Sequence, residues 1–582
     1  MPRDLNLRGV PKATASVPRW FRPLLLALSA ALLLGWFSPE ISDPDFWWHL
    51  KTGQYVLQEH SLPAPDPFAY TTTMGSTAYA GEPRTRYFNL THEWLAQVLL
   101  YVVYRASGFG GVVLFRAGVL ALVCAIVGLV AYWRSGGFYR ALAAAFASAG
   151  VVSAFAADRP FVITFLLLVV TIAILEWAGR EARPALWLLP PLLLIWANCH
   201  GGYFLGWVVL AAYSGEALLL RWRKRPVPGD RMLWAVCGIA VALSGFNPNG
   251  FRIPQILGYY RGSYLTSRLL EWAPTPWWPP RWYSLLLFGA VAVFLLAGRR
   301  VRVVDWLLFT AFTVAALTAY RNVVLIGLLA PILIVSYLPD WKRGSPSWFE
   351  YSAAAAVIAG LAAGIAGGSF FQLRANPWKW PSGAADFLLA HQVTQPMFNS
   401  YEYGGYLMWR LWPRERVFID GRALNESVFQ DYARILYNHD DSGGKSAQQL
   451  LDQYGVQTIV MNGFEYVTGN VYKLAPALAD PQQTEWKLVY SDAQAMVFLR
   501  HPPPDVQPLN SLAVLEHLEA ECDLHLQHEP QYSRCARSLG QVFSRVGDYA
   551  RARRWIGIYL RLPHDRDPEA EEAYRKLLGV GQ

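Results

Sequence analysis

Two carboxylates, an imidazole and three aromatic rings lie within residues 43–50 (DPDFWWHL), directly after the first apolar segment. Asp43 and Asp45 are two residues apart, so an extended segment or a turn directs both carboxylates toward one hydroxyl or one cation. One of them would take a proton from a hydroxyl, and the other would orient it or hold a divalent cation, Mg²⁺ or Mn²⁺. The alternative is that the pair caps the helix that follows, since Asp favours helix starts.

Nine more polar or charged residues are candidates for binding a substrate or its phosphate. They are His49, His92, Glu93, Asp158, Arg159, His200, Arg252, Glu271 and Arg321. Structural alternatives stay open, because many histidines are satisfied core residues and a glutamate before a predicted helix also favours the positive end of the helix dipole. Arg321 has no acidic neighbour in the sequence, which favours an anion such as phosphate as its partner.

The composition is that of a membrane protein. Of the 582 residues, 54% are apolar and 16% charged, whereas about a quarter of a soluble protein is charged. The 25 tryptophans are typical of a bilayer interface. The net charge of +9 is divided among short clusters between apolar runs, so the sequence predicts contacts with membrane lipids and no nucleic-acid partner.

Basic clusters orient the chain in the membrane by the positive-inside rule. Residues 1–19 form a basic tail predicted to be cytoplasmic, and residues 20–367 form a polytopic domain of about eleven spans. These spans are 20–38, 112–133, 139–157, 160–178, 184–198, 203–221, 231–246, 283–298, 304–320, 323–338 and 350–367. Residues 94–105 are too short to cross and are predicted to form an interfacial or re-entrant helix.

This topology places the short polar motifs that contain the candidate residues on the non-cytoplasmic side. Most of them lie in two outer loops, residues 39–111 and 247–282. The second loop also contains Arg252, Arg261, Arg268 and Arg281, against the positive-inside rule. We therefore expect the chemistry to take place outside the cytoplasm, with these arginines facing an anion.

A soluble region follows the last span. Residues 368–505 alternate predicted strands (396–399, 416–420, 457–461 and 486–490) with helical stretches, which indicates a periplasmic α/β domain. Gly404-Gly405 alone is weak evidence for a nucleotide. Residues 506–582 read as helices 515–526, 532–546, 549–560 and 569–578, an all-α tail resembling tetratricopeptide hairpins. Cys522 and Cys535 on successive tail helices are a disulfide candidate in an oxidising compartment.

The order of the short motifs resembles the GT-C class of integral-membrane glycosyltransferases. These motifs are the D-x-D of Asp43-Pro44-Asp45, then Asp66-Pro67-Phe68, His92-Glu93-Trp94, Asp158-Arg159-Pro160, residues 198–202, Asn247-Pro248 and Arg321-Asn322. The similarity covers about residues 20–500 and is closest to uncharacterised bacterial members. The W-W-D-Y-G motif of oligosaccharyltransferases is absent, which argues against protein N-glycosylation.

The resemblance implies a multi-pass protein of the bacterial inner membrane, with a cytoplasmic N-terminus and a periplasmic or extracellular C-terminal domain. It implies transfer of a sugar from a polyprenyl-phosphate donor to a glycan, lipid or protein acceptor, with Asp43 and Asp45 in the acidic motif that carries the catalytic acid residue. No cofactor is required by the sequence, although the two aspartates match a cation site. A non-catalytic scaffold, or a lipid or polysaccharide transporter with a periplasmic binding domain, is the alternative.

Overall fold

The computed structural model describes residues 17–579 except 181–182, 226–227, 261–262, 265–268, 340–345, 439–443, 466 and 481. Most of the basic tail, together with Arg261 and Arg268, therefore lies outside the described residues. The chain forms two compact units. Unit 1 comprises residues up to 41, 102–250 and 269–375, and unit 2 comprises residues 42–101, 251–268 and those from 376 on. Most of the first outer loop thus belongs to the same unit as the C-terminal region.

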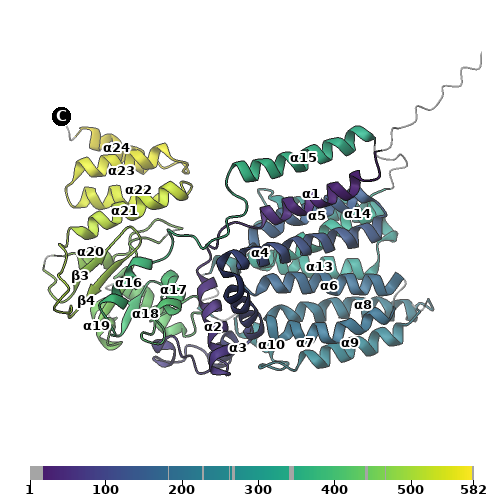
Figure 1. Cartoon of the computed structure of the whole chain (residues 1–582), viewed down its shortest axis with the longest axis horizontal. Helices are drawn as coiled ribbons and strands as arrows, with labels where there is room; N and C mark the ends of the chain where they lie inside the picture. Colours follow the sequence, from purple (N-terminus) through teal and green to yellow (C-terminus); the bar gives the residue numbers. More distant parts are fainter. Residues whose placement is uncertain are drawn as a thin grey trace, which may run out of the picture. The chain divides into compact units, whose positions relative to one another are not determined.

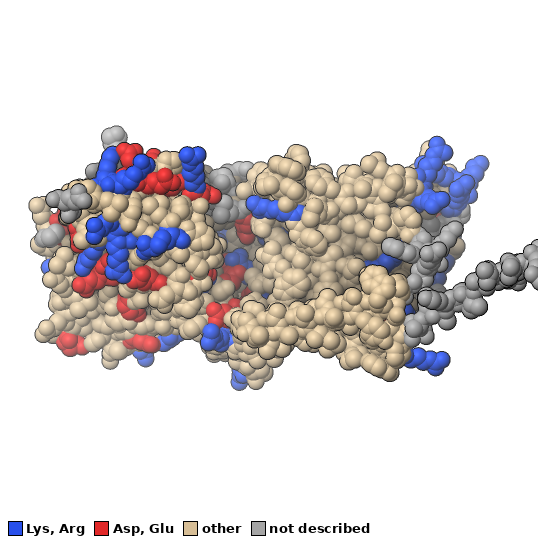
Figure 2. Space-filling model, turned by 90° about the horizontal axis from the view of Figure 1, so that it is seen from above, with Lys and Arg blue, Asp and Glu red and all other residues tan. Residues whose placement is uncertain are grey.

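Unit 1 is a bundle of long helices that lie side by side (Figure 1). They are α1 (Phe21–Trp36), most of α4 (Trp94–Ser135), α5 (Phe138–Val152), α6 (Phe161–Arg180), α7 (Leu189–Cys199), α8 (Phe204–Trp222), α9 (Asp230–Ser244), α12 (Trp282–Ala297), α13 (Val303–Thr318), α14 (Val324–Tyr337) and α15 (Ser347–Ala366). The face of this bundle seen in Figure 2 is mostly uncharged between its ends. An apolar surface of this kind suits a hydrocarbon environment.

Seven helical stretches of the described residues are long and apolar enough to cross a membrane. They include residues 161–180 with a mean hydropathy of 2.5 and residues 201–222 with 1.5. The other four predicted spans coincide with the shorter helices α1, α7, α9 and α13, of 11 to 16 residues. The helices therefore lie where the sequence predicts them. Seven are in stretches long and apolar enough to cross a membrane, and four are shorter.

Residues 94–105, predicted to form a separate non-crossing helix, lie in the first of the two helical segments of α4, which meet at a kink. The backbone of α4 departs from helical geometry at Gly108, where φ is 64° and ψ is −161°. A positive φ costs glycine little, so the break falls at a residue that tolerates it. The interfacial placement of the first part of α4 stays a prediction.

A network of charged side chains joins four helices at one end of unit 1. Arg134 of α4 donates to Asp305 at the start of α13 (Nη1–Oδ1 2.9 Å), and Arg302 donates to Glu176 of α6 (2.7 Å). Glu176 also accepts from the hydroxyl of Tyr213 in α8 at 2.7 Å. Charges in an apolar bundle are costly unless they are paired, so this network fixes the packing of the helices that supply it.

Unit 2 contains a four-stranded sheet. The strands are β1 (Met397–Asn399), β2 (Thr458–Met461), β3 (Lys487–Ser491) and β4 (Met496–Leu499), in the order β1-β2-β4-β3. β1 and β2 are parallel, and β4 is antiparallel to both β2 and β3. The helices of this unit are α2 (Asp45–Glu59), α3 (Glu82–Thr91), α10 (Ile253–Tyr260), α16 (Ser382–Ala390), α17 (Tyr401–Leu411), α18 (Glu426–Tyr437), α19 (Ala447–Gln453), α20 (Leu474–Leu478) and α21 to α24. The α/β character predicted from the sequence is confirmed.

One predicted strand is wrong and one strand was missed. Residues 416–420 do not join the sheet; instead Val417 forms an isolated parallel bridge with Ala69 of the first outer loop. Its amide donates to Phe68 O at 3.1 Å, and its carbonyl accepts from Tyr70 N at 3.2 Å. Residues that favour β-structure indicate an extended backbone, but they do not determine which other segment it pairs with. β4, which the sequence analysis did not assign, takes the place between β2 and β3.

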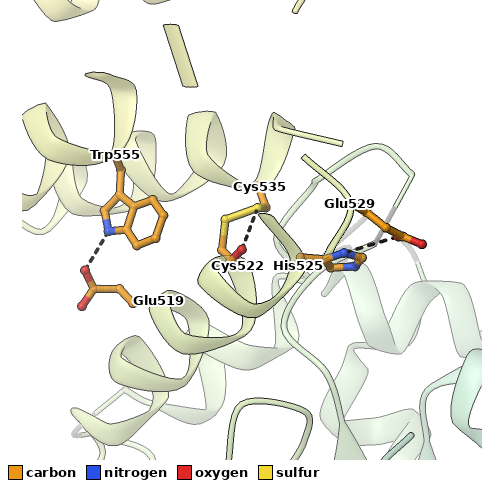
Figure 3. Close-up of a disulfide and its surroundings, with 6 residues drawn as sticks. All are labelled: Glu519, Cys522, His525, Glu529, Cys535 and Trp555. Carbon is orange, nitrogen blue, oxygen red and sulfur yellow. Dashed lines mark hydrogen bonds and ion pairs between the residues drawn. A yellow bond between two sulfur atoms is a disulfide. The ribbon is translucent and has the colours of Figure 1, made fainter. Parts of the chain in front are cut away.

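The tail consists of four helices that stack side by side (Figure 1): α21 (Ala513–His528), α22 (Arg534–Arg545), α23 (Tyr549–Arg561) and α24 (Pro568–Gly579). Cys522 and Cys535 form a disulfide between α21 and α22, with Cα atoms 5.8 Å apart. Figure 3 shows Trp555 on the same side of this bridge as Glu519, to which its indole donates at 2.7 Å. Phe464 of the α/β region is buried in the core of the tail, so the two parts pack against each other.

A buried carboxyl group makes the stability of unit 2 depend on pH. Burial raises the pKa of Glu402, in the first turn of α17, from 4.5 to about 7, and the charges of Glu465 and Glu521 add to this effect. The folded state therefore holds a proton that the unfolded chain releases, and stability falls as pH rises from about 4.5 to about 7.

We predict that Glu402→Gln removes this dependence and raises the melting temperature above pH 7, because the amide carries no charge to bury. Thermal unfolding of purified protein across this pH range measures the effect. Glu516→Gln, at an exposed position of α21, is the matched control and should leave the pH profile unchanged. A Glu402→Gln profile parallel to that of the wild type would contradict the prediction.

Candidate active site

The two aspartates of the DPD motif lie at the start of α2. Pro44 immediately precedes Asp45, the first residue of this helix, where a proline is favoured because the first helical amides have no intrahelical acceptor. Asp43 Oδ1 accepts a hydrogen bond from the Asp45 amide at 3.0 Å. This contact agrees with the alternative prediction, in which the aspartates cap the helix. Asp45 sits in the first turn, where the helix dipole favours a negative charge. Both side chains are partly exposed.

The aromatic residues that follow are buried. Trp47 is 3% exposed and packs edge-on against Trp380 and Tyr406, with ring centroids 5.4 Å and 4.9 Å away. Trp48 is 7% exposed. Neither ring is placed as an interfacial anchor or as an open stacking platform. Both rings are part of the packed interior next to the carboxylates.

His49, Glu93 and His92 form a chain of buried or half-buried groups in unit 2. His49 is 2% exposed, with Nδ1 3.1 Å from Gln97 Nε2 and 3.5 Å from Glu93 Oε2. The other oxygen of Glu93 lies 3.2 Å from His92 Nε2, and His92 Nδ1 lies 2.8 Å from the Phe88 carbonyl. A carbonyl only accepts, so His92 Nδ1 carries a hydrogen. Glu93 therefore links the two imidazoles next to the DPD motif.

A buried arginine joins the first outer loop to the C-terminal region. Arg422 donates to Asp66 (Nη1–Oδ1 2.9 Å) and to Asp420 (Nε–Oδ1 2.7 Å), and all three side chains are at most 2% exposed. Burial alone would lower the pKa of Arg422, but the charges of Asp420 and Asp66 outweigh it and raise this pKa. Asp66 also accepts from the amides of Phe68 and Ala69, each at 3.2 Å. In the sequence, Asp66 stands out only as part of a short motif, and no local signal marks Arg422.

Gly421, between the two partners of this network, lies against Asp45. A Cβ added to Gly421 would be 1.8 Å from Asp45 Oδ1 and 3.1 Å from Trp48 Nε1. A Cβ on Gly405 of α17 would similarly be 2.8 Å from the Pro44 carbonyl. Gly405 therefore packs against the start of α2, whereas Gly404 packs against Ile419 and Asp420, and the C-terminal region forms one side of the carboxylate site.

Lys51 lies in α2, one turn after Trp48, and was not predicted from the sequence. It is 5% exposed, and its Nζ lies 3.1 Å from Gln54 Oε1 and 4.8 Å from the centre of the Trp412 ring. Burial lowers the pKa of Lys51 to about 8. Its ammonium group is thus held by an aromatic face and an amide oxygen.

Asp158, a predicted substrate residue, is 3% exposed and pairs with the buried Arg116 of α4 in unit 1. Arg116 also donates to the carbonyls of Phe37 (3.3 Å) and Pro39. Arg116, inside the predicted span 112–133, thus points into the bundle and holds the segment that leads to the DPD motif. These contacts give Asp158 a structural role.

The other predicted residues of unit 1 lie in separate contacts. His200 Nδ1 is bonded to Thr164 and to the Gly202 amide, and Arg159 follows Asp158 in the loop before α6. The sequence near Arg321 contains no acidic residue. In the structure, however, Glu271 Oε1 lies 3.4 Å from Arg321 Nη1. Its guanidinium also lies 4.7 Å from the Trp272 ring centre. In unit 2, Arg252 is exposed directly before α10.

The aspartates alone are a sparse cation site. Among the described residues, neither belongs to a group of three or more His, Cys, Asp or Glu side chains with ligand atoms all within 4.8 Å of one another. Oxygen ligands of Mg²⁺ are commonly one or two carboxylates completed by water and substrate phosphate. Asp43 and Asp45 fit that sparser pattern, so a metal role stays a prediction.

No protein-family model and no curated protein matches this sequence. Two solved structures of the Archaeoglobus fulgidus oligosaccharyltransferase are similar to the chain. One is tethered by a disulfide to an acceptor peptide containing the NVT sequon; it is 10% identical, and the match covers 84% of this chain and 75% of that chain with a TM-score of 0.49. The apo form is 11% identical, with coverage of 84% and 76% and a TM-score of 0.49.

Gly421→Ala tests whether the C-terminal region shapes the carboxylate site. The added methyl group would displace Asp45, and a displacement of about 1 Å costs on the order of 10²-fold in rate. We expect such a loss of the sugar transfer that the sequence predicts, measured in proteoliposomes, with an unchanged gel-filtration profile. Gly258→Ala, a helical position with open space around its Cβ, is the control. Full activity of Gly421→Ala would show that Asp45 is not confined there.

Asp158→Asn separates a structural role of Asp158 from substrate binding. Removing one partner leaves Arg116 as an uncompensated buried charge, which costs about 3–5 kcal/mol. We expect a marked drop in the melting temperature in detergent and partial recovery in Arg116→Met/Asp158→Leu. Asp386→Asn breaks a pair whose aspartate is 66% exposed and should change stability by less than about 1 kcal/mol. An unchanged melting temperature with abolished activity would favour the substrate role instead.

Proposed function

We propose that this chain is an integral-membrane glycosyltransferase of the GT-C type. It moves a sugar from a polyprenyl-phosphate donor to a glycan, lipid or protein acceptor on the non-cytoplasmic side of the bacterial inner membrane. The observation that carries the proposal is the setting of Asp45, a partly exposed carboxylate on a buried aromatic base, confined by Gly421 and close to the His49–Glu93–His92 chain. A carboxylate held in this way suits a general base.

We assign different roles to the two aspartates. Asp43 Oδ1 accepts the Asp45 amide, and a hydrogen bond to a carboxylate oxygen stabilises the charged form. We assign Asp43 to positioning the start of α2 through this bond, and we assign the base to Asp45. Asp45 takes the proton of the acceptor hydroxyl, whose oxygen forms a bond to the anomeric carbon as the bond to the donor phosphate breaks. One displacement inverts the configuration of that carbon.

The leaving phosphate needs compensation for the charge that develops on it. The predicted partners are Arg159, Arg321 or the arginines of residues 252–281. Arg321 suits this role because its contact with Glu271 uses Nη1, whereas a guanidinium has five N–H donors. Its side chain is 35% exposed, which leaves it accessible to an anion.

The Cys522–Cys535 disulfide supports the proposed orientation. Disulfides persist in oxidising compartments and are rare in the cytosol. A tail outside the cytoplasm agrees with the topology that the basic clusters predict for the membrane domain.

Transfer from defined polyprenyl-phosphate sugars in proteoliposomes tests the function. Loss of a general base typically costs about 10²–10⁴-fold, so Asp45→Asn should fall by that amount and Asp43→Asn by less. Glu59→Gln, an exposed position at the other end of α2, should retain full activity. If Asp43→Asn and Asp45→Asn both transfer at the wild-type rate, the assignment is wrong. Activity with EDTA, with and without added Mn²⁺ or Mg²⁺, decides the metal requirement.

A further inference from the structure

Basic side chains gather around the end of α6, the end of α8 and the start of α9 in unit 1. Residues 180–183 and 221–231 together contain seven basic and two acidic residues. The basic side chains are all exposed, and we call them the basic cluster: Arg180, Arg183, Arg221, Arg223, Lys224, Arg225 and Arg231. Groups of about four to eight such residues next to a membrane helix attract anionic lipids.

Two arginines of the basic cluster are held at the start of α9. Arg221 Nη1 donates to the buried Asp230 (Oδ2) at 2.8 Å, and the Arg221 guanidinium lies 5.7 Å from the Trp234 ring centre. Arg183 comes from the other loop and lies against Gly229, where a Cβ would be 2.7 Å from Arg183 Nη1. Since Gly229 directly precedes Asp230, the two loops bring a guanidinium each to adjoining positions. No described carboxylate forms an ion pair with Arg183.

The turn that ends α8 has a lysine where glycine is usual. Lys224 has a φ of 58°, its amide donates to the Arg221 carbonyl at 2.9 Å, and the Arg225 amide donates to the Leu220 carbonyl at 2.8 Å. These two bonds form a Schellman motif, whose left-handed residue is most often glycine because a Cβ is unfavourable there. Arg223 and Arg225 already supply positive charge to the helix end. The backbone strain at Lys224 therefore favours a further role for its ammonium group.

Exposed apolar side chains adjoin the basic cluster. Trp222, directly after Arg221, is 80% exposed, and Leu218, one turn earlier on α8, is 59% exposed. Trp187 and Leu188, at the end of the loop that contains Arg183, are 53% and 50% exposed. Tryptophan favours the level of the lipid headgroups, where one side of the ring meets hydrocarbon. A ligand that fits this surface therefore combines negative charge with an apolar part.

We propose that the basic cluster is a binding site for an anionic phospholipid. Arg183, Arg221 and Lys224 bind the phosphate of the headgroup, and the acyl chains lie along Trp187 and Trp222. A guanidinium has five N–H donors, and the bond from Arg221 to Asp230 uses Nη1, so donors remain for phosphate oxygens. The ligand is a phospholipid of the surrounding bilayer, and the site does not depend on the proposed sugar transfer.

Native mass spectrometry of the full-length protein in detergent tests the site, by titration with phosphatidylglycerol and, separately, with uncharged phosphatidylcholine. Each basic side chain near an anionic surface contributes about fivefold to binding. We therefore expect Arg183→Gln/Lys224→Gln to bind phosphatidylglycerol about 25-fold more weakly. The control Arg299→Gln/Arg300→Gln removes two exposed charges after α12 and should bind as the wild type does. An equal loss in both variants, or equal binding of the two lipids by the wild type, would overturn the proposal.

Lys224→Gly separates lipid binding from the stability of the turn. Glycine adopts a positive φ at little cost, so the melting temperature should not fall, while phosphatidylglycerol binding should weaken about fivefold through the lost charge. Asn438→Gly is the matched control, because Asn438 also ends a helix with a positive φ, of 44°, but belongs to unit 2. It should leave lipid binding unchanged. Wild-type binding of phosphatidylglycerol by Lys224→Gly would contradict the role of Lys224 in the site.

Discussion

The buried guanidinium of Arg422 is the constraint on which the candidate active site depends. It is surrounded by Asp66 and Asp420, whose positions differ by more than 350 residues in the sequence. A charge desolvated to this extent is tolerated only when its partners are in place. The first outer loop and the C-terminal region must therefore fold as one body, and Gly421 is brought against Asp45 as a consequence. The C-terminal region is part of the site and not an appendage.

Unit 1 solves a related problem with the same chemistry. Arg116 and Asp158 neutralise each other inside the bundle, and Arg116 also binds two carbonyl groups just before the DPD motif. At another position, Arg134, Asp305 and Glu176 link helices through a second buried network. Paired charges fix positions strongly in an apolar environment, since the alternative is an unpaired charge. In each unit, ion pairs thus hold the segments that present the polar motifs.

The sequence was most informative where one physical property acts along a continuous segment. Apolar runs located eleven helices among the described residues of unit 1, and turn residues with helical periodicity located the four helices described in the tail. It was less informative for residues 416–420, whose β-branched and aromatic residues indicate extended structure but whose partner, Ala69, is remote. The same limit concealed the role of Asp66, because its partner Arg422 is distant in sequence.

Candidate residues divide in the same way. The DPD motif, the two cysteines and His200 were found because their types and local spacing carry chemical meaning. The amino-acid sequence alone determined the membrane class, the helix positions and the location of an acidic motif at the start of a helix. Only the tertiary structure decided that His49 is buried, that Arg321 has an acidic neighbour, that Asp158 pairs with Arg116 and that Gly421 borders Asp45. The reason is physical: burial and pairing depend on segments that meet only in the folded chain, whereas apolarity and helix propensity act between neighbours.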